Sequence, residues 1–522
     1  MSVLADSLYA LWSQCDLQTV ILATTIFLFT YWALQLLLAN HRNLPPGPRG
    51  FPLIGNVLDL VNPTPFRNLR DMASQYGDVL SLHLGQQLVV VLNGYQSIHE
   101  ALVGKADDFA DRPHIPPMKT GTLNSGIIMA NGKVWKFKRR VILSSLRTFG
   151  MGKASMEKRI QEEVLHLLDV FDEMSVDSST FNPLSHTTNS IYNVICSITL
   201  GERFDYTDHR FVDIISSLNS ILDLSHVYFG FMYFFPGSYK ILELLLRGHH
   251  ARDHRKIYDV LEPFIEQHET TYDSQNMRDL IDVFLKATRE WESRHFSESF
   301  GRKGLPFKYF YIYALILDTF VAGTETTATT LTWGWLLMLK NLDTQTQIQA
   351  ELDNVVGRGR LPEMSDKPNL PYTEAAVNEV LRMSSTAPLS VPRWTTTDTC
   401  VLGYDIPKNT MVWPNLWSVL YDPTLWPNPD RFDPGRFLDS DGNFYRPDAF
   451  IPFGSGSRVC LGEQLAKMEL FLVFSSVLHQ FRLEVDNEFP LPLLEGTMHI
   501  TLQPPKYKMR VIRRVQVNEQ DE

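Results

Sequence analysis

Cysteine is scarce in this sequence of 522 residues: the chain has four, and no two of them lie close together. Neither a zinc-type spacing nor a disulfide framework is therefore visible, and scattered thiols are typical of a reducing compartment. The formal net charge of −11 argues against nucleic acid as a general partner. Solenoid-type repeats are absent as well. The hydrophobic content of 44% nevertheless predicts a large packed core rather than disorder.

The amino end carries a long apolar run. Residues Leu17–Ala39 include no charge and, at 23 residues, exceed the ~20 that a helix needs to cross a bilayer. Acidic residues precede the run and basic residues follow it, which predicts a luminal N-terminus and a cytosolic remainder. A cleaved signal peptide is the alternative, but it would need a basic start and a shorter apolar stretch. We therefore predict a retained membrane anchor over residues 1–43, with its transmembrane helix at about 17–39.

The remainder reads as one large domain, mainly α with a minor β part. A stiff hinge at 44–52 precedes it, because LPPGPRGFP is rich in prolines, which fix φ and remove donors. Val79–Gly94 predicts two strands around a turn at Gly85. Helical periodicity dominates the middle of the chain, and from Pro306 to Lys340 it continues without a proline or a polar break. That segment predicts a helix crossing the whole domain, which we place at 53–522.

Cys460 lies between a glycine-rich turn and a predicted helix, in the stretch FGSGSRVCLG that begins at Phe453. Free backbone N–H groups at the start of a helix stabilise negative charge and favour a thiolate. A phosphate site is the alternative for such a turn, but the GxGxxG spacing and a surrounding βαβ unit are missing. Arg458 could pair with an acidic ligand group, and the glycines would let a flat object approach the backbone. These neighbours fit haem, because haem combines a metal with acidic propionates.

The same stretch resembles the FxxGxRxCxG haem loop of the cytochrome P-450 superfamily, and further motifs follow in that family's order. The matching segments are WKFKR (Trp135–Arg139), AGTETT (Ala322–Thr327), EVLR (Glu379–Arg382) and FDPGRF (Phe432–Phe437). The resemblance covers about residues 44–515. The motifs and the anchor together resemble the microsomal class of the family. The amino-acid sequences of the predicted helices resemble the family-2-like animal branch.

The resemblance implies a single large helical domain of the cytochrome P-450 type with small β-sheets, preceded by one transmembrane helix. It makes residues 53–522 a haem-thiolate catalytic domain. Cys460 would be the axial ligand of haem b, since an anionic sulfur favours O–O cleavage. The other residues implied to bind the cofactor are Arg112, Trp135, Arg139, Arg393, Phe453, Gly454 and Arg458. Glu379, Arg382 and Arg436 are implied to form a structural triad that pins the loop presenting Cys460.

Oxygen cleavage needs protons delivered away from bulk water, and Glu325 and Thr326 lie in the middle of the long apolar helix. A hydroxyl beside a carboxylate can hold a water chain and relay protons. The alternative is that Thr326 bonds back to its own helix and Glu325 lies on a solvated face. The helical pattern alone leaves both open, whereas the resemblance implies the catalytic role. Because hydroperoxide isomerases of this fold commonly depart from this pair, its presence favours monooxygenation.

Electrons must come from another protein, because no flavin- or nicotinamide-binding motif is present. The segment KVWKFKRR is basic within an acidic chain. Lys133, Lys136, Lys138 and Arg140 are therefore candidates for docking an acidic NADPH-cytochrome P-450 reductase, with cytochrome b5 as a further partner. The alternative is an ordinary solvated helix face.

The predicted function is that of a monooxygenase anchored in the endoplasmic reticulum membrane. It would hydroxylate or epoxidise a lipophilic steroid, fatty acid, sterol-derived compound or xenobiotic, using O2 and electrons from NADPH. The alternatives are a haem-binding sensor or carrier without turnover, and a hydroperoxide isomerase on the same fold. By the resemblance, the apolar pocket is lined by residues 115–128, 320–326, 387–391 and 497–500. An aromatic run at 227–237 either belongs to the core or forms an access channel that dips into the membrane.

Overall fold

The computed structural model describes residues 18–20, 22–23, 25–27, 30, 43–113, 126–148, 154–177, 180–234, 239–294, 309–486 and 489–514. For residues 223–234 and 239–251 it describes the backbone alone. Across these ranges, no helix combines the length and the apolar character that crossing a membrane requires. Most of the predicted transmembrane helix at 17–39 lies outside the described residues, as do the side chains of the aromatic run at 227–237.

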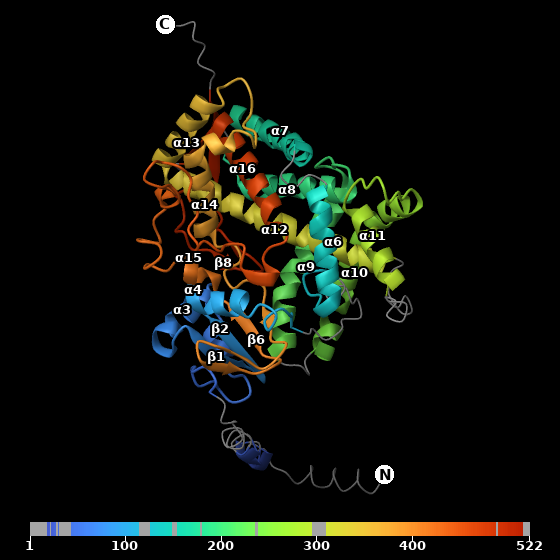
Figure 1. Cartoon of the computed structure of the whole chain (residues 1–522), viewed down its shortest axis with the longest axis vertical. Coiled ribbons are helices and arrows are strands. Elements are labelled where there is room, and N and C mark those ends of the chain that lie inside the picture. Colours follow the sequence, from blue (N-terminus) through green and yellow to red (C-terminus); the bar gives the residue numbers. More distant parts are fainter. Residues whose placement is uncertain are drawn as a thin grey trace.

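Helices make up most of the molecule, in agreement with the predicted class (Figure 1). They are α3 (Pro65–Tyr76), α4 (Gly94–His99), α6 (Gly132–Thr148), α7 (Ala154–Val176), α8 (Pro183–Leu200), α9 (His209–Phe234), α10 (Tyr239–Thr270), α11 (Leu280–Arg294), α12 (Phe310–Lys340), α13 (Leu342–Val355), α14 (Pro371–Ser384), α15 (Leu416–Leu420) and α16 (Glu463–Gln480). Shorter helical turns are η1 (Val57–Leu60), η2 (Glu100–Gly104), η3 (Lys367–Asn369), η4 (Pro434–Phe437) and η5 (Gly456–Arg458). One continuous hydrophobic core runs through α7 to α16.

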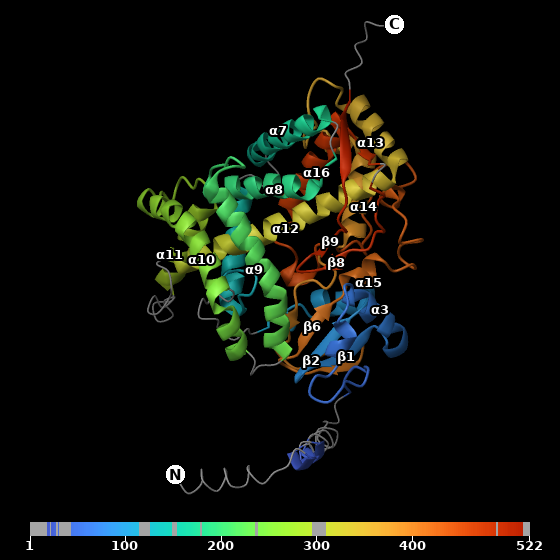
Figure 2. The ribbon, with the colours of Figure 1, turned by 180° about the vertical axis from the view of Figure 1, so that it is seen from behind.

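Helix α12 is the long helix that the sequence predicts, and it passes through the middle of the helical part in both views (Figures 1 and 2). It spans 31 residues and is buried on most sides, as expected for a helix that is apolar nearly all round. Trp335 shows how its neighbours hold it. The Trp335 ring stacks on Phe474 of α16 with centroids 5.5 Å apart, and its Nε1 donates to Thr187 Oγ1 of α8 at 3.3 Å.

A four-stranded sheet lies at one end of the molecule, beside α3 (Figure 1). Its order is β1 (Val79–Leu84), β2 (Gln87–Leu92), β6 (Met411–Pro414) and β3 (Arg393–Trp394). Strands β1 and β2 are antiparallel around Gly85, whose φ is +60°, so the two predicted strands and their turn are confirmed. Strand β2 then pairs in parallel with β6, and β6 pairs antiparallel with β3. The sheet therefore brings residues 89–92 of β2 beside residues 411–414 of β6.

The proline-rich segment packs against this sheet. Pro45 O and Pro46 O accept hydrogen bonds from the hydroxyl and the N–H of Ser81 at 2.7 and 2.9 Å. A Cβ on Gly47 would lie 1.8 Å from Ser81 O, so only glycine fits this approach. Asn43 is also bonded to Gly403 and Asp405. The chain is thus held from Asn43 onward, and any free movement of a preceding anchor must arise before that residue.

Three two-stranded sheets complete the β part. They are β4 (Thr399–Val401) with β5 (Tyr404–Ile406), β7 (Phe481–Val485) with β10 (Met509–Arg513), and β8 (Thr497–Met498) with β9 (Leu502–Gln503). The β8–β9 hairpin is fastened to α12 and to the segment that follows α14. Leu502 N donates to Thr386 O at 2.9 Å, and Trp333 Nε1 of α12 donates to Leu502 O at 2.8 Å.

A buried histidine joins the end of α10 to the start of α11. His268 Nε2 lies 2.7 Å from Asp279 Oδ2, and its Nδ1 lies 2.7 Å from Phe264 O. Because both partners are acceptors, both ring nitrogens donate and the imidazole is protonated. Burial lowers the pKa of His268, but the hydrogen bond and the charge of Asp279 raise it by more, so the net shift is upward.

This upward shift predicts a pH-dependent contribution to stability. Because the folded-state pKa of His268 exceeds the unfolded value, the contribution is complete below about pH 6.5 and is lost as pH rises through the folded pKa. We expect His268→Gln to reduce the fall of the thermal midpoint between pH 6 and 9. His209→Gln, at an exposed position, is the control. Equal pH profiles for wild type and His268→Gln would contradict the assignment.

Candidate functional site

The Cys460 loop is closed by backbone hydrogen bonds before α16 begins. Cys460 N donates to Phe453 O at 3.0 Å, and Gly454 and Gly456 both have a φ of +74°, which favours glycine. Helix α16 starts at Glu463, three residues after Cys460. The side chain of Cys460 is exposed, whereas Cys196 is buried in the helical core. The loop thus presents a sulfur at the start of a helix, as the sequence predicts.

Opposing influences act on the Cys460 thiol. Although the side chain is exposed, the surrounding protein raises the pKa of Cys460 by desolvation, and this exceeds the lowering by the Gly462 N–H group and by Arg139. The start of the helix thus favours a thiolate, as predicted, but does not outweigh desolvation. A bound cation would supply the missing stabilisation, because metal coordination deprotonates a thiol.

Gly456 is required by the protein itself. A Cβ at this position would lie 1.7 Å from Leu102 O in η2, so the loop docks on that turn through a bare glycine. A Cβ on Gly462 would meet nothing within 4 Å. The loop glycines were predicted to let a ligand approach the backbone. At Gly456 the close neighbour is η2 of the protein itself.

Several buried cations surround the loop. Arg458 stacks over the Trp135 ring at 3.7 Å from its centroid, and its Nε and Nη2 donate to Ala110 O and Ala130 O at 2.7 and 2.6 Å. Arg139 Nη2 donates to Val459 O at 2.6 Å, directly before Cys460. The structure therefore brings residues of α6 and of the loop together around the cysteine.

Arg393 completes this cation group. It is 2% exposed, and its Nε has no hydrogen-bond partner among the described residues. Burial and the charge of Arg139 lower its pKa to about 9. Burial and the charges of Arg393 and Arg139 likewise lower the pKa of Arg458 to about 9, although Asp111 opposes the shift. Three guanidinium groups thus repel one another in a buried site, and an acidic ligand such as a haem propionate fits there.

Arg112 donates hydrogen bonds to backbone carbonyl groups next to these arginines. Its Nη1 donates to Val391 O and Pro392 O at 2.7 and 2.8 Å, and its Nε donates to Ile128 O at 3.2 Å. It therefore ties the segment before Arg393 to the segment after 125.

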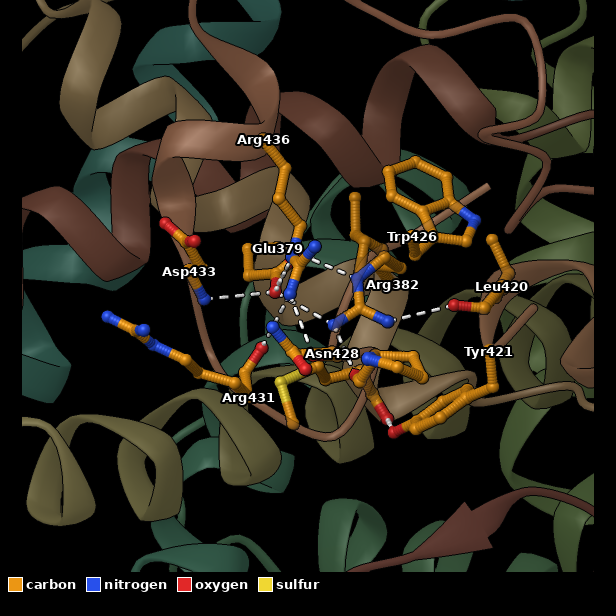
Figure 3. A network of polar contacts seen from close by, with 12 residues as sticks. Glu379, Arg382, Leu420, Tyr421, Trp426, Asn428, Arg431, Asp433 and Arg436 are labelled. Atoms are coloured by element: carbon orange, nitrogen blue, oxygen red, sulfur yellow. Dashed lines mark hydrogen bonds and ion pairs between the residues drawn. The ribbon is translucent and has the colours of Figure 1, made fainter. Parts of the chain in front are cut away.

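The three residues of the implied triad meet in one network, in which Glu379 and Arg382 are fully buried (Figure 3). Arg382 Nε and Nη2 donate to the two Glu379 carboxylate oxygens at 2.7 and 2.8 Å, and Arg436 Nε donates to Glu379 Oε1 at 3.3 Å. The remaining hydrogen bonds of the two arginines reach Leu420 O, Pro429 O, Asn428 O and Arg431 O. Within the described part of the chain, the triad thus holds residues 420–436 directly, and not the Cys460 loop as expected.

Glu325 and Thr326 are neighbours on α12 but do not bond to each other. Thr326 Oγ1 donates back to Ala322 O at 2.7 Å, which is the structural alternative considered above. Glu325 is half-buried, and its Oε1 accepts hydrogen bonds from Thr501 and Gln503. The alternative of a solvated face for Glu325 does not apply, because its carboxylate contacts the β8–β9 hairpin.

Exposed apolar residues mark the predicted pocket segments. Ala322 is exposed in the middle of α12, and Val391 and Ile500 are each 38% exposed. Residues 115–125 of the first pocket segment lie outside the described residues.

The basic residues of α6 differ in their exposure to solvent. Lys133, Lys136 and Arg140 are exposed, and Lys136 pairs with Asp107 at 3.0 Å. Lys138 is only 5% exposed, and its Nζ donates to Gly126 O at 3.2 Å. Its assignment to a docking surface is therefore wrong, because the helical turn points it inward. Burial lowers its pKa to about 8, against the opposing charge of Asp318.

Two acids on long helices were not predicted as functional residues from the sequence. Asp318 of α12 accepts hydrogen bonds from Ile127 N and Ile128 N at 2.5 and 2.8 Å and so holds the segment that Arg112 also contacts. Glu469 of α16 accepts from Thr327 Oγ1 at 3.2 Å, and burial raises its pKa to about 8. Each acid has apolar neighbours along its helix. An acid in such surroundings needs a polar partner, and this is the sequence signal from which the contact could have been predicted.

Comparisons with known proteins match nearly the whole chain. The family model described as "Cytochrome P450" matches residues 45–511. Cytochrome P450 2U1 of Rattus norvegicus is 37% identical over 498 residues, which cover 90% of this chain and 91% of that protein. Cytochrome P450 2B2 of Rattus norvegicus is 38% identical over 460 residues, covering 86% and 90% respectively. Cytochrome P450 2J2 of Homo sapiens is 36% identical over 517 residues, covering 97% and 98%.

The two glycines of the loop give a matched pair of variants. We expect Gly456→Ala to destabilise the protein by about 3 kcal/mol or more, because the new Cβ is strained by its φ and clashes with Leu102 O. Gly462→Ala, with open space around its Cβ, should cost less than about 1 kcal/mol. Thermal unfolding at equal haem content measures the difference, and equal losses would show that the loop does not need its docking on η2.

Proposed function

Because this chain belongs to the cytochrome P450 family and is a P450 monooxygenase, we propose that it hydroxylates or epoxidises a lipophilic substrate with Cys460 as its haem ligand. The observation that carries the proposal is the meeting of two features at one place. A loop presents an exposed sulfur at the start of α16, and buried guanidinium groups short of acidic partners surround it. This favours a cofactor that has both a metal and acidic groups.

Haem b, when bound, supplies the activation of O2 on which the family's chemistry depends. Cys460 would bind its iron, with Phe453 and Gly454 in the loop beside it. Arg393 has an unpartnered Nε to offer to a propionate, and Arg139 and Arg458 would add their charges. Trp135 would act by holding the guanidinium of Arg458 in place, and Arg112 by fixing the backbone next to Arg393.

Glu325 and Thr326 would move protons from solvent to the oxygen side of the site. The Thr326 hydroxyl donates to Ala322 O but keeps lone pairs that can accept a hydrogen bond from water. Glu325 lies one residue away with a carboxylate that can exchange protons with water. A water between the two side chains would complete the path, because they do not contact each other directly.

Electrons would reach the site from NADPH through a flavoprotein reductase. Lys133, Lys136 and Arg140 form the exposed part of the α6 basic segment, and Arg139 of the same helix bonds to the carbonyl directly before Cys460. An acidic partner that docks there, either the reductase or cytochrome b5, would be close to the cysteine loop.

Membrane attachment would place the enzyme at the endoplasmic reticulum, with residues 1–43 as anchor and 53–522 as cytosolic catalytic domain. The described chain enters the fold at the sheet end (Figure 1). Apolar side chains that follow the docked hinge are unusually exposed there: Phe51, Leu53, Leu58 and Val61 range from 52% to 73%. This patch favours contact of the sheet end with the bilayer.

The ligand assignment is tested by Cys460→His. The carbon monoxide complex of the reduced wild type should show the long-wavelength Soret band typical of a thiolate ligand. In the variant the band should move to shorter wavelength and monooxygenation should be lost, because neutral imidazole lacks the electron donation of a thiolate. Cys400→His, at an exposed cysteine of β4, should retain the band and the activity. A fully loaded Cys460→His variant that keeps both would refute the assignment.

The anchor is tested by removing residues 1–43. Because Pro45 and Pro46 are already bonded to β1, we expect the truncated protein to fold and to retain haem. In carbonate extraction of membranes it should be released, whereas the full chain should stay in the pellet. Residual binding that salt or carbonate removes agrees with peripheral contact of the sheet end. A truncated protein that resists extraction would place the membrane attachment elsewhere.

A further inference from the structure

The carboxylate of Glu325 is held by two residues that are far away in sequence. Thr501 Oγ1 and Gln503 Nε2 both donate to Glu325 Oε1, each at 2.9 Å. Neither residue belongs to any of the family motifs quoted above. Among the described residues, no hydrogen bond is formed to the second oxygen, Oε2, or between Glu325 and Thr326.

The two donors are themselves firmly placed. Thr501 is 2% exposed, and its hydroxyl lies 3.5 Å from that of Thr329 on α12. Leu502, between them, is bonded through its N–H to Thr386 and through its carbonyl to Trp333. The hairpin therefore cannot rotate away from α12 without breaking several hydrogen bonds, and the position of Oε1 follows from that rigid contact.

Two donors on one oxygen have a chemical consequence. They select one orientation of the side chain, because hydrogen bonds to a carboxylate are strong and directional. Oε1 is thereby saturated, and a proton taken up by Glu325 goes to Oε2. The carboxylate then has one oxygen for structure and one for proton exchange.

We propose that Thr501 and Gln503 are positioning residues for proton delivery, which hold Oε1 of Glu325 so that Oε2 accepts protons from solvent and passes them toward Thr326. The inference rests on the proposed role of Glu325 and Thr326. A purely structural role, in which the same bonds only fasten the hairpin to α12, is the alternative that the test must separate.

The variants remove each donor at nearly constant volume: Thr501→Val and Gln503→Leu, with Thr501→Ser restoring the hydroxyl and Glu325→Gln as reference. The haem-loaded enzyme is supplied with NADPH and reductase, without added substrate. The measured quantities are the ratio of hydrogen peroxide to water formed per NADPH and its solvent isotope effect. Haem content and the reduced carbon monoxide spectrum verify that each variant is loaded.

We expect each single variant to raise the peroxide-to-water ratio by about threefold to tenfold, the range expected for the net loss of one ordinary hydrogen bond. Thr501→Ser should return the ratio to that of wild type. Neither Thr501→Val nor Gln503→Leu should change the ratio further in the Glu325→Gln background, because both act through Glu325. Gln503 is half-buried, so Gln503→Leu carries the test if Thr501→Val does not fold.

The outcomes distinguish a failure of the proposed proton relay from a failure of the positioning role. If Glu325→Gln leaves the ratio unchanged, the proposed relay fails and the inference fails with it. If Glu325→Gln raises the ratio but Thr501→Val and Gln503→Leu do not, the inference alone is overturned. It is also overturned if their effects add to that of Glu325→Gln, because they would then act on the fold and not through the carboxylate.

Discussion

Burial of positive charge without equal negative charge is the constraint on which the site depends. Arg139, Arg393 and Arg458 come from α6, β3 and the Cys460 loop, and neighbouring guanidinium charge adds to burial in lowering the pKa of Arg393 and Arg458. Such a group is unfavourable by itself, so carbonyl oxygens and the Trp135 ring must hold it in place. An acidic cofactor would neutralise it, and the bound form would therefore be the more stable one.

Helix α12 connects this charged region to the rest of the molecule. Three of its polar side chains contact three different segments: Asp318 holds residues 127 and 128, Glu325 contacts the β8–β9 hairpin, and Thr327 bonds to Glu469 of α16. Polar groups in an apolar helix must find such partners, since an unpaired buried polar group is costly. The same helix thereby positions a pocket segment, a hairpin and the helix that follows Cys460.

Much of the fold could be predicted because the patterns that specify it are local. Alternation around Gly85 indicated the β1–β2 pair, and an unbroken apolar run indicated α12. Motif spacing brought Glu379, Arg382 and Arg436 together correctly, although their contacts hold residues 420–436 and not the cysteine loop. Charge pattern was a poor guide on α6, because a run of lysines and arginines does not reveal which turn of the helix faces inward, and Lys138 is buried.

The sequence by itself determined the helical class, the order of the motifs, and the presence of a cysteine at the start of a helix. These follow from periodicity and from short-range residue preferences. Only the tertiary structure decided that Gly456 docks on Leu102, that Thr326 bonds to its own helix, and that Glu325 is held by Thr501 and Gln503. Those contacts join residues up to 354 positions apart, as with Gly456 and Leu102 (456 − 102 = 354), and no local pattern specifies which distant backbone or side chain will complete a buried polar group.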